Sequence, residues 1–234
     1  MTVADVEVHT NYVQELRRVF WPNLPMMFVS STIVCIATVA AIALAPSVSP
    51  LSLLLWVVVI GPAFAGLVAQ LDEAICGHDD PPVFSYFRYL RRSWRRGLVL
   101  GVIPAVTGGL TLVALEVYHR TGSWVALVPA SISGAFTVLG LITYLVAMPI
   151  TAEYATIRMR ALVIASLLVV SRAPVPIIGA LSVAGVIGWA AAQFSAAIIL
   201  LLPGPLALVL VVAVWTSAQK VQIRPRVRER GAPD

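Results

Sequence analysis

Five arginines close together are the most prominent chemical feature of this sequence. They lie in the segment 83–96 and are Arg88, Arg91, Arg92, Arg95 and Arg96. Guanidinium groups bind carboxylates and phosphates through parallel hydrogen bonds. Near a membrane surface, each cation contributes about 1 kcal/mol to the attraction for anionic lipids. We therefore interpret this segment, which also contains Trp94, as a contact site for anionic lipid or for a partner protein.

The other charged residues form weaker patterns. Glu116 precedes Arg120 by four residues, which is the favourable order for an ion pair along a helix. We expect this pair at the outer membrane boundary, and a contact with a polar substrate is the alternative.

A loop is expected to hold the acidic residues Asp72, Glu73, Asp79 and Asp80. They are interpreted as helix caps that neutralise nearby arginines. The alternative is a cation site, although their spacing matches no EF-hand loop.

No sequence motif for catalysis or metal binding is found. The sequence contains no Gly-x-Ser-x-Gly, no His-Glu-x-x-His and no phosphate-binding glycine loop. Its histidines are scattered, and Cys35 and Cys76 are expected at different depths, so neither a disulfide nor a metal site is predicted. We therefore expect a protein that is not an enzyme and that has no catalytic residues and no bound cofactor.

The composition predicts the kind of element that positions these residues. Of 234 residues, 59% are hydrophobic and 12% are charged, and the mean hydropathy is +0.92. Soluble domains are about half apolar and about a quarter charged, so a soluble, disordered or coiled-coil protein is excluded. The net charge of +5 does not indicate nucleic-acid binding, because the basic residues flank apolar runs. The chain is predicted to be an all-α polytopic membrane protein.

Long apolar runs predict six transmembrane helices. A helix needs about 20 apolar residues to cross a hydrocarbon layer of roughly 30 Å. The expected spans are Pro25–Ala45, Leu53–Leu71, Gly97–Tyr118, Ala126–Pro149 and two helices within Pro176–Ala218. The last run is too long for one crossing and must turn back, either near Gln193–Ser195 or at Pro203-Gly204-Pro205. No charged residue is expected in the middle of a span, which disfavours an ion-coupled pump.

The distribution of basic residues predicts the orientation. With six helices, fifteen of the sixteen basic residues lie on one side of the membrane, and Arg120 alone lies on the other. Positively charged loops stay in the cytoplasm, so a multi-pass plasma-membrane protein with both termini in the cytoplasm is predicted. Its parts are a cytoplasmic N-terminal segment 1–24, a transmembrane domain 25–218 with a cytoplasmic basic loop 72–96, and a basic tail 219–234.

Three stretches on the predicted cytoplasmic side resemble one another. Residues 13–20, 83–96 and 153–172 each combine arginines with apolar residues at helical spacing, and each precedes a pair of spans. This pattern favours three repeats of an amphipathic helix plus a transmembrane hairpin, although compositional bias alone could produce it. The spans also contain candidate helix kinks or hinges, at Gly61, Pro62, Pro149 and Pro205. Close helix packing is the alternative role for these small residues and prolines.

Residues 60–97 resemble a known family. The run 60–67 reads IGPAFAGL, and a charged loop then leads to the run 84–97, which reads FSYFRYLRRSWRRG. This is similar to the YesL-like family of bacterial membrane proteins, whose members carry a Gly-Pro-Ala helix, a charged loop and an aromatic and basic segment. Residues 146–149 resemble the later hydrophobic-proline element of that family. The sequence departs from the family at Ser93, where an asparagine is common.

The resemblance leads to the first of two functional hypotheses. Members of the family are often encoded beside carbohydrate ABC importers, which implies a non-enzymatic protein that accompanies carbohydrate uptake and docks ABC transporter subunits through its basic cytoplasmic helix. No catalytic or binding residue is carried over from the family.

In the alternative hypothesis the chain is itself a transporter or permease subunit. Asp72-Glu73-Ala74 with Gly77 weakly resembles the Glu-Ala-Ala coupling loop of ABC permeases, but Pro81 interrupts it where a helix should continue. Both hypotheses predict membrane lipid as a partner, and neither predicts nucleic acid. Both also allow the chain to form a homo-oligomer.

Overall fold

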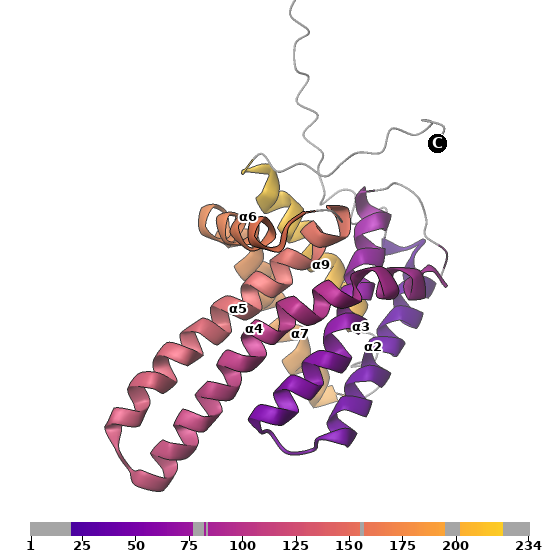
Figure 1. Cartoon of the computed structure of the whole chain (residues 1–234). Coiled ribbons are helices and arrows are strands. Elements are labelled where there is room, and N and C mark those ends of the chain that lie inside the picture. Colours follow the sequence, from indigo (N-terminus) through magenta and orange to yellow (C-terminus); the bar gives the residue numbers. More distant parts are fainter. Residues whose placement is uncertain (1–19, 77–81, 83, 155–156, 195–201, 222–234) are drawn as a thin grey trace, which may run out of the picture.

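The computed structural model describes residues 20–76, 82, 84–154, 157–194 and 202–221, and this part of the chain is helical without strands. The elements are α2 (Leu24–Leu44), α3 (Pro50–Cys76), α4 (Ser85–Thr121), η1 (Trp124–Ala126), α5 (Leu127–Glu153), α6 (Met159–Arg172), α7 (Pro174–Phe194) and α9 (Pro203–Gln219). Figure 1 shows their arrangement. The predicted all-helical class is confirmed for these residues.

Within the described residues, four helical segments are long and apolar enough to cross a membrane. They are α2, α3, α4 and the continuous segment of η1 and α5. A fifth results if α6 and the first part of α7, which meet at an angle of 89°, are counted as one broken span. The helix α9 is apolar but shorter, with 17 residues. The described residues thus contain four to five candidate spans, which confirms a chain with several membrane-spanning helices. The predicted number of six stays a prediction.

The basic segment and the third expected span form one helix, α4. It has 37 residues, which at 1.5 Å per residue is about 55 Å and exceeds the roughly 30 Å hydrocarbon layer. Arginine is a good helix former, and neither glycine nor proline occurs between positions 84 and 96. A helix therefore continues across the change in hydropathy at residue 97. In Figure 1 the first turns of α4 run in a different direction from the rest of it.

The helix α6 lies across one end of the bundle, and α7 then turns back along it (Figure 1). The bend follows from the sequence Ala173-Pro174, because proline disfavours helical geometry at the residue before it. Ala173 has φ −138° and ψ 63°, outside the helical region. Residues 195–201, between α7 and α9, lie outside the described residues. The choice between the two turn positions expected from the sequence therefore stays open.

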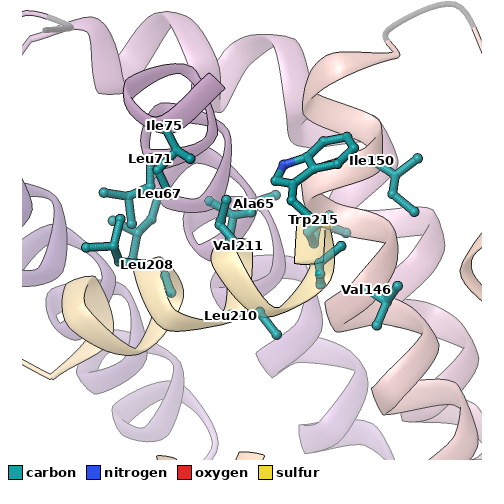
Figure 2. Packing of buried hydrophobic residues seen from close by; sticks show 14 of the residues in the cluster. Ala65, Leu67, Leu71, Ile75, Val146, Ile150, Leu208, Leu210, Val211 and Trp215 are labelled. Atoms are coloured by element: carbon teal, nitrogen blue, oxygen red, sulfur yellow. The ribbon is translucent and has the colours of Figure 1, made fainter. Parts of the chain in front are cut away.

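The core is built around α3, which contacts α2, α4, α5 and α9. Large apolar side chains from three helices meet in it (Figure 2). They include Leu67, Leu71 and Ile75 from α3, Val146 and Ile150 from α5, and Leu208, Val211 and Trp215 from α9. The α4–α5 hairpin instead reaches away from the other helices (Figure 1) and exposes Leu110, Val128 and Phe136. Such apolar exposure suits contact with lipid chains rather than with water.

Candidate functional site

The first turns of α4 expose a mixed basic and aromatic surface, which we name the basic face. It consists of Phe84, Phe87, Arg88, Arg91, Arg92, Trp94 and Arg95, all of them exposed. At 100° per residue these positions occupy slightly less than half of the helix circumference. Phe87 and Trp94 are 57% and 52% exposed, so the two rings are available for contact together with the arginines.

The opposite side of the same turns packs against α3. Tyr86 is fully buried and its hydroxyl donates a hydrogen bond to the carbonyl oxygen of Ala63 over 2.9 Å. A Cβ atom at Gly66 would lie 3.1 Å from the Cα of Leu90, so the absence of a side chain at Gly66 permits this close approach. Tyr89 is also buried, and the guanidinium of Arg88 lies 5.5 Å from its ring centre. Packing of this side therefore directs the basic face outward.

Arg96 has a different environment from the other four arginines. It is only partly exposed, and its guanidinium donates hydrogen bonds to the carbonyl oxygens of Tyr154 over 3.0 Å and Ile157 over 3.4 Å. These carbonyls follow the C-terminal end of α5, where a positive charge is favourable. Arg96 therefore holds the link between α5 and α6 against α4.

A small polar cavity lies between α3, α4 and α5. Its volume is about 80 Å³, and its lining residues are Ala69, Asp72, Glu73, Tyr89, Arg92, Ser93, Arg96, Thr151 and Ala152. Cavities that bind drug-sized ligands usually measure about 300–1,000 Å³. The cavity therefore suits a small ion, a few waters or a ligand of few atoms, and it is too small to enclose a sugar.

Asp72 is the buried acidic residue of this cavity. It is 2% exposed, and its Oδ1 accepts a hydrogen bond of 2.6 Å from Nε1 of Trp215 in α9. Asp72 and Glu73 were expected in a loop, but they lie in α3, which continues to Cys76. The expectation was wrong because helical hydrogen bonding does not stop at the end of an apolar run. Asp79 and Asp80 lie outside the described residues.

Helical spacing in the sequence does not identify Asp72 as buried. Between Gly61 and Cys76 every residue of α3 is buried except Phe64 and Glu73, so burial in this part of the helix has no helical period. The burial of Asp72 follows from the continuation of α3 past Leu71.

A second buried polar group joins α2, α3 and α4. The hydroxyl of Ser30 donates to Oε1 of Gln70 over 2.6 Å, and Nε2 of Gln70 donates to the hydroxyl of Ser85 over 3.2 Å. Gln70 and Ser30 are fully buried. Because buried amides are costly unless they are hydrogen-bonded, this network holds the three helices together near the cavity.

Of the remaining predicted residues, only Pro149 lies at this end of the bundle, two residues before Thr151 of the cavity. Arg120 donates to Glu116 over 2.7 Å, and both side chains are well exposed near the far end of α4. Gly61 and Pro62 are buried within α3, where Tyr144 donates to the carbonyl oxygen of Gly61 over 3.1 Å. Pro149 lies inside α5, and Pro205 lies in the first turn of α9. These candidate kinks are thus dispersed over three helices.

The described residues include no group of three or more His, Cys, Asp or Glu side chains that could hold a metal ion. Cys35 and Cys76 are both buried, and no disulfide joins them. Comparison of the chain with protein-family models, with curated proteins and with solved structures gave no match.

Proposed function

We propose that this chain is a non-enzymatic membrane protein that docks a partner through the basic face of α4. The observation that carries the proposal is the exposure of four arginines beside Phe87 and Trp94 on one side of a helix whose other side is packed. Arginine and aromatic residues are enriched in the energetically important centres of protein interfaces. In the described part of the chain, no carboxylate forms an ion pair with these four arginines. An acidic surface on a partner would supply the missing charge.

The proposed partner is a subunit of a carbohydrate ABC importer in the plasma membrane. This choice depends on the resemblance of residues 60–97 to the YesL-like family, and the basic face provides a physical means of attachment. The charge distribution is compatible with a membrane orientation that places the basic face and the far end of the α4–α5 hairpin on opposite sides. Glu116 and Arg120 are the only charged residues of the described part near that far end. The other charged residues of the described part lie at the C-terminal ends of α3 and α5, in the first turns of α4, in or beside α6 and directly after α9.

We further propose six membrane crossings with the basic face in the cytoplasm. The helix α7 has 21 residues and α9 has 17, which gives lengths of about 31 Å and 25 Å, each close to the hydrocarbon thickness. With α6 lying across the bundle end, the order α6, α7, α9 is compatible with an amphipathic helix followed by a transmembrane hairpin. The same order fits α4 and α5. The first proposed repeat begins in residues 13–20, of which only Phe20 is among the described residues.

Co-purification from native membranes tests the docking proposal. The variant R88Q/R91Q/R95Q removes three charges of the basic face and leaves Arg92 and Arg96 of the cavity in place. We expect recovery of the importer subunits to fall at least about tenfold and importer-dependent sugar uptake to fall with it. The matched control is R120Q, which removes an exposed arginine at the far end. Unchanged recovery and uptake in the triple variant would contradict docking through this face.

A transporter or permease subunit is the second candidate, and the polar cavity between α3, α4 and α5 favours it. The two candidates differ in what the purified chain does alone. Docking predicts no solute flux into vesicles that contain only this protein, whereas a transporter moves its substrate under these conditions. The cavity volume of about 80 Å³ directs that assay toward small ions rather than sugars.

A further inference from the structure

The cavity between α3, α4 and α5 contains charges of both signs that do not satisfy one another. Asp72 and Glu73 line it from α3, and Arg92 lines it from α4. Within the described residues Glu73 and Arg92 form no ion pair, although both border the cavity. Because Arg92 is exposed and Glu73 is partly exposed, these two residues lie toward the opening, whereas Asp72 lies inside.

Ser93 and Asp72 have hydrogen-bonding capacity that the described residues do not use. Ser93 is 7% exposed, and its hydroxyl has no hydrogen-bond partner in the described part of the chain. Asp72 receives the indole N–H of Trp215 on Oδ1, and no second donor reaches its carboxylate from the described residues. No fully buried side-chain polar atom of the described part lacks a hydrogen-bond partner. Ser93 and Asp72 line the cavity, and they offer it a hydroxyl and a carboxylate oxygen to which water or a ligand can bind.

The size and charge of the cavity define a ligand class. A water molecule needs at least about 10–15 Å³ of such volume, so the 80 Å³ cavity accepts a group of only a few heavy atoms. A simple cation would complement Asp72 and Glu73 but not the arginines, and a simple anion would complement Arg92 and Arg96 but not the carboxylates. A small zwitterion satisfies both: an ammonium group donates to carboxylates and hydroxyls, and a guanidinium binds an oxyanion through parallel hydrogen bonds.

The position of the cavity selects one zwitterion. It lies where the apolar helices α3 and α5 give way to charged residues. In the membrane topology proposed above, which this step rests on, that level is the level of the phospholipid headgroups. We propose that this cavity binds phosphoethanolamine, either as the headgroup of phosphatidylethanolamine or as the free compound. The ammonium end, of only a few heavy atoms, enters the cavity toward Asp72, Glu73 and Ser93, and the phosphate lies at the opening toward Arg92. A choline headgroup would not substitute, because its trimethylammonium has no N–H to donate.

Native mass spectrometry of the purified full chain tests this assignment. The chain is equilibrated with phosphatidylcholine vesicles that contain a small, equal fraction of either phosphatidylethanolamine or phosphatidylglycerol. We expect phosphatidylethanolamine to be retained at least about tenfold better than either other lipid, the gain expected from one hydrogen-bonded charge contact. Equal retention of phosphatidylglycerol would overturn the role of the carboxylates, and equal retention of phosphatidylcholine would overturn the role of the ammonium.

Variants assign the retention to the cavity. E73Q and R92Q should each remove most of the preference for phosphatidylethanolamine, and their matched controls are E116Q and R160Q at exposed positions outside the cavity. S93A removes one hydroxyl and should weaken retention about threefold, which keeps the test decisive if a charge variant fails to fold. The proposal is overturned if the preference for phosphatidylethanolamine persists in E73Q, R92Q and S93A. It is also overturned if this preference falls as much in the controls E116Q and R160Q as in the cavity variants.

A competition experiment distinguishes the two sources of the headgroup. Free phosphoethanolamine that displaces the bound lipid at comparable concentration supports a soluble ligand, and retention of lipid despite excess free compound supports a lipid site. The proposal does not depend on docking, because the triple variant R88Q/R91Q/R95Q leaves the cavity residues unchanged. Loss of partner recovery in that variant with lipid preference intact would separate the two activities.

Discussion

The hydrogen bond between Trp215 and Asp72 joins α9 to α3 across 143 positions of sequence, and removing it should destabilise the whole bundle. Trp215 is fully buried. W215F keeps an aromatic ring but removes the N–H, so the buried carboxyl loses its donor at a cost of about 2 kcal/mol. The smaller ring adds about 1 kcal/mol in lost packing. For a chain of this size, about 3 kcal/mol corresponds to a decrease in Tm of about 6–12 °C.

A double-mutant cycle separates the hydrogen bond from the packing loss. In a D72L background no carboxyl remains to be satisfied, and the buried N–H of Trp215 has no acceptor. There W215F should cost no more than the packing component, about 1 kcal/mol or 2–4 °C. The assay is thermal unfolding of purified protein in one detergent at one heating rate, since such unfolding is often irreversible. The control is W189F at a position 69% exposed, where little change is expected. Equal decreases for W215F in both backgrounds would refute the reasoning.

Three further predictions use the same thermal assay. G204A should lower the Tm by about 4–8 °C, because a Cβ at this position would lie 2.6 Å from Oγ of Ser31. The control G188A should change the Tm little, because no atom lies within 4 Å of the added Cβ. Similar Tm values for the two variants would contradict close packing at the start of α9. Q70L should lower the Tm by about 4–8 °C through the loss of a buried network, and an unchanged Tm would show that the network does not stabilise the bundle. R120Q should lower the Tm by no more than about 2 °C, because an exposed pair contributes little, and a larger loss would indicate an unrecognised contact.

The helical class and several helix positions could be predicted from apolar runs. The expected span Pro25–Ala45 corresponds to α2, Leu24–Leu44, and Ala126–Pro149 corresponds to η1 with most of α5. The agreement has a simple cause: a run of about 20 apolar residues can satisfy its backbone hydrogen bonds in a membrane only as a helix.

The pairing of the helices could not be predicted in the same way. In a uniformly apolar helix, lipid-facing and buried positions have similar hydropathy, so Val113 and Ala114 are not distinguished by pattern although only Ala114 is buried. The contact between Trp215 and Asp72 depends on how α9 crosses α3, and neither residue carries a local signal for the other. The burial of Ser93 likewise follows from the packing of α4 on α3.

The most direct test of the account is the side of the membrane on which the basic face lies. R91C, in a background where the buried Cys35 and Cys76 are replaced by alanine, is treated with a membrane-impermeant maleimide in intact and in permeabilised cells. S123C, in the exposed turn between α4 and α5, reports on the opposite side. We predict that R91C is labelled only after permeabilisation and S123C already in intact cells. Labelling of R91C in intact cells would contradict the cytoplasmic basic face and the docking function that depends on it.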